Sequence, residues 1–165
     1  MSLTHEVVKP TLDRLHVHYV HDADRNMVLA SFTIDGARGG RSVVMVVPND
    51  EGHDLHIWAG YCEVPASRKV AVLQVLNELN STRRFLKWSI TQDLVTVETD
   101  AELSFSSDPQ GHFALAYCSL VEALHVYWPR IVRAATQGKT RSRVDREVAA
   151  ILDQLSQRET GESTE

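Results

Sequence analysis

Three histidines that lie close together are the first candidates for chemistry. His16, His18 and His21 are followed by Asp22 and Asp24, and imidazole and carboxylate groups are common metal ligands. On a helix, however, His16 and His18 would point about 200° apart, and only an extended backbone would bring them to one face. A solvated helix end is therefore favoured, and a small metal-dependent enzyme that uses His16, His18 and His21 remains an alternative.

Other short motifs depart from the patterns that bind calcium or nucleotides. The turn that begins at Asp22 starts like an EF-hand loop, but Met27 stands where that loop needs glycine. Residues 138–140 resemble the end of a phosphate-binding loop but do not follow a strand. Neither Cys62 nor Cys118 lies in a recognisable nucleophile motif. We therefore expect no catalytic residue, no metal, no cofactor and no enzymatic activity.

The segment 139–146 carries a basic cluster that could contact nucleic-acid phosphates. Its basic residues are Lys139, Arg141, Arg143 and Arg146, and two acidic residues interrupt them. The whole chain has 17 basic and 22 acidic residues, and a net charge of -5 opposes non-specific attraction to nucleic acid or anionic membranes. A solvated linker is favoured, and a transcriptional co-regulator that uses this segment is a second alternative.

Length and composition limit the class of protein that can position these residues. A chain of 165 residues is the usual size of one domain, and 43% hydrophobic with 24% charged residues is typical of a globular protein. No apolar run approaches the roughly 20 residues that cross a bilayer, and the first ten residues lack a signal-peptide core. We expect a cytoplasmic protein without a membrane partner.

The first half of the chain predicts one helix and a three-stranded meander. Apolar residues at helical spacing indicate a helix over residues 8–19. Alternating or fully apolar runs over residues 28–34, 43–47 and 55–60, joined by polar turns, indicate three antiparallel strands. The run 43–47 is apolar on both faces, which is typical of a central strand.

The second half predicts a helix, a hairpin and a long helix. The second helix starts after Pro65 and ends near Asn80, and strands over residues 85–90 and 94–103 follow. Asp108 and Pro109 are typical of a helix start. The long helix that begins there contains Pro129, which should kink or break it.

The C-terminal residues predict an appendage to this domain. Residues 139–156 place apolar side chains at the spacing of an amphipathic helix, namely Val144, Val148, Ile151, Leu152 and Leu155. Residues 157–165 are polar and acidic, which predicts a disordered tail. The expected organisation is a domain over residues 1–138, an appended helix over 139–156 and a tail over 157–165.

These elements predict an α+β fold with the order α-β-β-β-α-β-β-α plus a C-terminal helix. Its five-stranded antiparallel sheet would carry the helices on one face. On the opposite face the alternation places Leu29, His56 and Trp58, and the central strand adds either Val44 and Val46 or its alternate residues. We take Leu29, Val44, Val46, His56 and Trp58 as candidate residues of a protein interface. The other interpretation is that the last helix folds back and covers this face.

Several of these segments resemble the YbjN-type domain, a bacterial family of sensory transduction regulators with a fold like that of type III secretion chaperones. They are LDRLHVHY (residues 12–19), NELN (77–80), the strands 85–90 and 95–103, and YWPRI (127–131). The resemblance implies an α+β domain that lacks established catalytic residues, forms dimers and binds proteins. Asn77 and Asn80 match the family motif, and we interpret both as structural.

The leading hypothesis is a non-enzymatic chaperone-like or regulatory protein. It would form a homodimer in the cytoplasm and present an apolar surface to an unidentified polypeptide partner.

Overall fold

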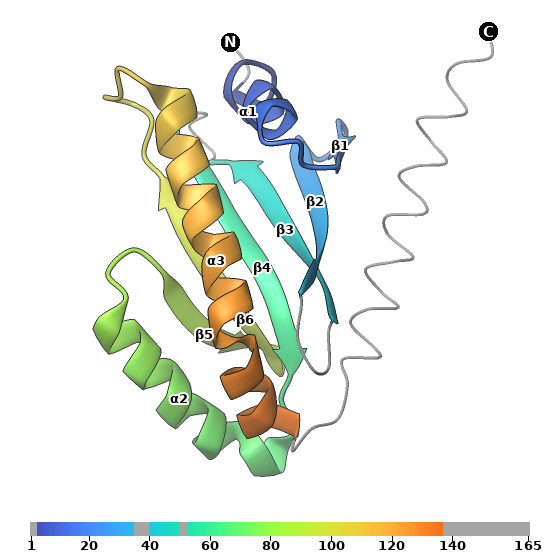
Figure 1. Ribbon diagram of the computed structural model, residues 1–165, viewed down its shortest axis with the longest axis vertical. Helices are drawn as coiled ribbons and strands as arrows, with labels where there is room; N and C mark the ends of the chain where they lie inside the picture. The colour runs from blue at the N-terminus through green and yellow to red at the C-terminus, as the bar shows by residue number, and fades with distance from the viewer. Residues whose placement is uncertain (1–2, 35–39, 50–52, 137–165) are drawn as a thin grey trace, which may run out of the picture.

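The structure is a computed structural model that describes residues 3–34, 40–49 and 53–136. Helices and strands alternate along these residues in an α+β arrangement (Figure 1). In chain order the elements are η1 (Thr4–Val8), α1 (Lys9–Arg14), β1 (Tyr19–Asp22), β2 (Met27–Ile34), β3 (Gly40–Pro48), β4 (Leu55–Glu63), η2 (Ala66–Arg68), α2 (Lys69–Thr82), β5 (Lys87–Thr91), β6 (Leu94–Ala101) and α3 (Pro109–Thr136).

The strands of the described residues form one antiparallel sheet of six strands, in the order β1-β2-β3-β4-β6-β5. The five predicted strands are present and β1 is a sixth, so the predicted number was wrong. The predicted hairpin turn between β5 and β6 is confirmed. Gln92 and Asp93 close it with φ of 50° and 66°, the left-handed pair that a tight two-residue hairpin requires.

The first helix is shorter than its apolar spacing predicted. His16 has a φ of 54°, and the Val17 N–H donates to the Leu12 carbonyl at 3.0 Å, which together form a left-handed helix stop. The chain then turns, and Tyr19 begins β1, where it pairs with Ala30 of β2. The predicted helix is present, but its predicted end at residue 19 was wrong, because this local stop and the pairing with β2 outweigh the helical spacing.

The helices pack on one face of the sheet (Figure 1). α3 crosses β4 and β6, and α2 packs against β5 and α3. Trp88 and Trp128 lie in this core and are 3% and 4% exposed. The largest fully buried side chains of this core are Phe113, Leu12, Ile34, Leu55, Ile57, Leu76, Leu120, Leu124, Ile131, Val8 and Val28.

The predicted start of the long helix is confirmed, and Pro129 does not break the helix, so a kink there is the part of the prediction that stays open. The Gly111 N–H donates to Asp108 Oδ1 at 2.9 Å, and Pro109 occupies the first helical position. α3 then continues through Pro129 to Thr136. Pro129 itself is exposed, whereas Ile131 is fully buried, so packing of the inner side of the helix compensates for the lost backbone hydrogen bond.

The predicted helix over residues 139–156 and the predicted tail over residues 157–165 lie outside the described residues. Within the part of the chain that the structure describes, no helix is both long enough and apolar enough to span a membrane.

Candidate protein-binding surface

The sheet face opposite the helices carries an apolar row that crosses four strands. Register places Val20 of β1, Leu29 of β2, Met45 of β3 and Trp58 of β4 side by side. Directly paired residues of an antiparallel sheet point to the same side, so these side chains share one face. Glu98 of β6 continues the row. We call this side of the sheet, which also includes Met27, Val43, Val47, His56 and Asp100, the open face.

The centre of the open face is a small apolar cluster that is separate from the main core. Leu29 and Val43 are 2% and 5% exposed, and Val20, Met27 and Met45 pack around them. All five side chains come from β1, β2 and β3, and none from a described helix. Trp58 is partly exposed beside this cluster. The open face therefore has an apolar centre to which the described helices contribute nothing.

Charged side chains border this apolar centre on the β4 and β6 side. His56 Nδ1 lies 2.8 Å from Asp100 Oδ1, and His56 Nε2 lies 3.8 Å from Glu98 Oε2. Lys87 Nζ lies 3.5 Å from Glu98 Oε1. An apolar centre with a polar border is the usual composition of a protein-binding surface.

Two of the five candidate interface residues lie on the other face. Val44 and Val46 pair with Ala30 and Val28, and both belong to the core beneath the helices, with exposures of 0% and 1%. Their placement on the open face was wrong, and the alternate residues of β3 lie there instead. Leu29, His56 and Trp58 are on the open face as expected, and their role in an interface stays a prediction.

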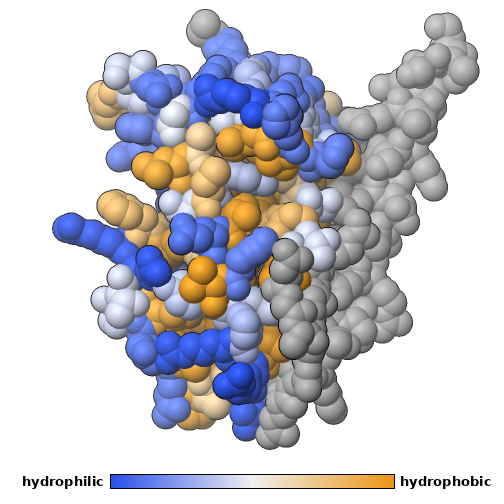
Figure 2. All heavy atoms as spheres, in the orientation of Figure 1, coloured by the Kyte–Doolittle hydropathy of each residue, from blue (hydrophilic) through white to orange (hydrophobic). Residues whose placement is uncertain are grey.

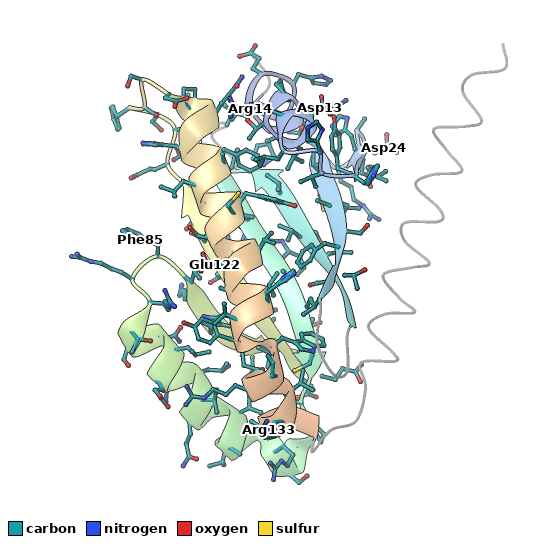
Figure 3. All side chains as sticks on the ribbon, viewed as in Figure 1. Asp13, Arg14, Asp24, Phe85, Glu122 and Arg133 are labelled. Carbon is teal, nitrogen blue, oxygen red and sulfur yellow. The ribbon has the colours of Figure 1, made fainter. Side chains whose placement is uncertain are left out.

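A second exposed surface lies on the helix side, where Figure 2 shows apolar patches among polar side chains over α3. Between α3 and the loop that follows α2 there is a groove of about 290 Å³, which includes Phe85, Leu86 and Val126. Phe85 is 81% exposed and projects from this loop, as Figure 3 shows. Sequence reasoning missed this surface because it placed Phe85 in a strand, whereas β5 begins at Lys87.

The NELN and YWPRI segments contact each other across α2 and α3. Glu78 pairs with Arg130, and the Arg83 Nε–H donates to the Tyr127 hydroxyl at 2.6 Å. Asn80 bonds the backbone of Trp88 instead of ending α2, which continues to Thr82. These segments therefore join α2, β5 and α3, which supports the structural interpretation of Asn80. Asn77 is exposed on the same helix, and its structural role stays a prediction.

The histidine cluster does not assemble into a metal site in the described residues. His16 ends α1, His18 lies in the following loop, and His21 lies in β1, where its ring packs edge-on against His5 with centroids 5.4 Å apart. In residues 3–34, 40–49 and 53–136, no group of three or more His, Cys, Asp or Glu side chains is placed to hold a metal ion. The basic cluster over residues 139–146 lies outside the described residues.

A single antiparallel sheet with helices on one face is a class of α+β fold that also occurs in a complex of the type III secretion system. The structure aligns with a chain of the ExsC–ExsE complex (14% identity, TM-score 0.54, 79% of this chain and 97% of the other). It also aligns with a chain of the heterodimeric ExoU–SpcU complex from the type III secretion system of Pseudomonas aeruginosa (12% identity, TM-score 0.51, 79% and 99%). At these identities the likeness shows the fold alone.

Within this class the chain belongs to the YbjN family. Residues 4–109, more than half of the chain, match the model of that family, which is described as "Putative bacterial sensory transduction regulator". YbjN from E. coli has a similar structure, with 11% identity and a TM-score of 0.57 over 78% of this chain and 91% of that one. Among curated proteins, none matches this chain in sequence. The E. coli protein is described as "a putative transcription regulator".

Proposed function

We propose that this chain is a non-enzymatic, cytoplasmic domain of chaperone-like or regulatory type that binds a polypeptide partner through the open face. The observation that carries the proposal is the apolar row from Val20 to Trp58, whose central cluster contains no side chain of a described helix and which charged residues border. An apolar surface with a polar rim favours protein binding. The ExoU–SpcU and ExsC–ExsE structures are themselves complexes of two proteins, which is consistent with such a role.

A homodimer is the second part of this proposal. Val70 and Leu73 of α2 are 72% and 45% exposed and lie one helical turn apart, so they give α2 an apolar strip at which a second copy could pack. Light scattering should then give twice the chain mass of 18.5 kDa. A strict monomer at micromolar concentration would contradict the dimer without affecting the open-face proposal.

Replacement of Trp58 by aspartate tests the open face as a binding surface. A charge at the end of the apolar row should weaken partner binding at least tenfold, because desolvating an unpaired carboxylate costs more than about 1.4 kcal/mol. The measurement is affinity purification from the source cells with quantitative mass spectrometry, followed by titration of the captured partner.

The matched control is Leu115→Asp, because Leu115 is 69% exposed on α3, away from the open face. Both variants should retain the circular dichroism of the parent chain. Partner affinities that stay equal for the parent chain, Trp58→Asp and Leu115→Asp would rule out the open face as the binding surface.

A further inference from the structure

The open face keeps apolar side chains in partial contact with solvent. Leu29 and Val43 are almost fully buried among Val20, Met27 and Met45. These three and Trp58 stay partly exposed on the side of the sheet to which the described helices contribute no side chain. β3 is apolar on both faces, and a strand of that kind is normally covered on both. The cover is either another segment of this chain or another molecule.

The described chain ends beside the strand that carries Trp58. Arg68 Nε–H donates to the carbonyl of Ala134 at 2.8 Å, which holds the last turn of α3 next to η2. η2 follows directly on β4, so α3 ends where β4 ends (Figure 1). Trp58 and His56 lie on the open side of that strand. The described chain therefore ends beside the end of β4. From this point the next residues can pass to either face of the sheet.

The residues that follow are long enough to reach the open face. Residues 137–143 span up to about 23 Å when extended. Stacked layers of secondary structure lie only about 10 Å apart. Seven residues can therefore pass around the end of the sheet.

The next segment has a matching apolar side and a matching length. Val144, Val148, Ile151, Leu152 and Leu155 recur at the spacing of one helical face. A helix over residues 144–155 would be about 18 Å long. The apolar row from β1 to β4 crosses four strands, which is about 14 Å between the outer two. The sizes of the two apolar surfaces therefore agree.

Charge is balanced on both sides of this contact. Glu98 and Asp100 at the border of the open face already pair with His56 and Lys87. At the start of the segment, Arg143 and Arg146 alternate with Asp145 and Glu147. Charges of both signs at the rim set the orientation of a contact more than its affinity.

We propose that residues 144–155 form an amphipathic helix that docks on the open face of the same molecule, with its apolar side on the row from Val20 to Trp58. The docked helix covers the surface that a polypeptide partner would use, so the partner must displace it. This competition rests on the proposed function, whereas the docking itself does not.

Trp58 reports directly on the docking. The chain has three tryptophans, and the other two, Trp88 and Trp128, are 3% and 4% exposed in the main core. In the full-length chain, Ile151→Glu places a charge on the apolar side of the segment and should release it. We expect a red shift of the tryptophan emission and about a twofold rise in acrylamide quenching. Ala150→Glu is the matched control, because the neighbouring residue points away from the apolar side, and its spectrum should equal that of the parent chain.

The effect must come from Trp58 and from the same molecule. In a Trp58→Phe background, Ile151→Glu should leave emission unchanged. An Ile151→Glu spectrum equal to that of the parent chain overturns the proposal. Protection of Trp58 from quenching that disappears on dilution also overturns the proposal, because a cover that is lost on dilution belongs to a second copy of the chain. If Ile151→Glu lowers the circular dichroism of the domain, Ile151→Ser replaces it, with the same expected and contradictory results.

A measurement of partner binding distinguishes a failure of the docking from a failure of the proposed function. Ile151→Glu should bind the captured partner several-fold more tightly than the parent chain. A spectral change without any partner for either chain supports the docking and contradicts the proposed function. An unchanged spectrum with a partner that depends on Trp58 overturns the docking and leaves the proposed function standing.

Discussion

Asp54 connects the start of β4 to the loop that follows β6. Its Oδ1 accepts the Leu103 N–H at 2.7 Å, and the Ser104 N–H and hydroxyl at 3.3 and 3.0 Å. The Leu103 hydrogen bond is the main cause that lowers the pKa of Asp54; the bonds from Ser104 add to it, and desolvation opposes it. The ionised carboxylate therefore stabilises the connection between β4 and the loop before α3.

Asp54→Asn should remove a part of the pH dependence of stability. Because the pKa of Asp54 is lower in the folded than in the unfolded chain, its contribution is complete at neutral pH. That contribution is lost as the pH falls from about 5 through the folded pKa. We expect the variant to be about 1 kcal/mol less stable at pH 7 and to approach the parent chain at low pH. Urea unfolding between pH 3 and 7 measures this, and parallel curves for the two chains would contradict it.

The sequence could not single out Asp54, because its partners lie about 50 residues further along the chain. The same limit applies to the histidines. Their types and spacing permitted a metal site, but the helix stop at His16 and the entry of His21 into β1 place them on different elements. Local motifs such as the Asp108 cap, which depend on neighbours in sequence, were predictable.

α2 protects the edge strand β5. The Asn80 Nδ2–H donates to the Trp88 carbonyl at 2.9 Å, and the Trp88 N–H donates to Asn80 Oδ1 at 2.8 Å. β5 is an outer strand of the sheet, with β6 as its neighbour. The Asn80 side chain thus provides the two hydrogen bonds that an added strand would provide at this position, and it blocks pairing there.

Asn80→Asp should destabilise the domain, because a carboxylate can accept the Trp88 N–H but faces the Trp88 carbonyl without a proton to donate. The expected loss is about 1–3 kcal/mol in the free energy of unfolding. Asn77→Asp makes the same chemical change at an exposed position of the same helix and should cost less than about 0.5 kcal/mol. Urea unfolding of the two variants is the measurement, and equal losses would show that the pair of bonds to Trp88 is not responsible.

Element types were predictable where one period dominated the sequence. The apolar stripe of α3 and the alternation in β2 and β4 agree with the structure. β1 was not predictable, since Leu15 and Tyr19 continue the helical spacing of the residues before them, and only pairing with β2 makes Tyr19–Asp22 a strand. The prediction for Pro129 considered only the backbone hydrogen bond that proline removes. It did not include the packing of the residues before and after Pro129 against the core.

At the scale of the whole molecule, β3 lies between two apolar layers. Val46 is 1% exposed and faces the helices, and Val47 is partly exposed and faces the open side. An unbroken apolar run carries no polar residue that marks its outer side, so its alternation fits either face. Only the pairing of β3 with β2 and β4 decides which of its residues face the helices. For this reason Val44 and Val46 were predicted on the wrong face.

Aspartate substitutions at these adjacent positions test the assignment of the two faces. Val46→Asp buries a carboxylate in the main core and should cost more than about 4 kcal/mol, enough to unfold a domain of ordinary stability. Val47→Asp should remain folded, because its side chain can reach solvent. Circular dichroism and urea unfolding distinguish the two, and a similar loss for both variants would mean that both faces belong to one closed core.

α3 has a consequence for how the protein is made. It packs against α1 and β2 near the start of the chain, and against β4, α2 and β6 later in it. During synthesis on the ribosome all six strands emerge before α3, and the faces of β4 and β6 that α3 covers stay open until it follows. A nascent chain of this protein therefore carries these uncovered strand faces until α3 (Pro109–Thr136) has emerged. In the cell, the yield of folded protein should depend on the interval between emergence of β6 and emergence of α3.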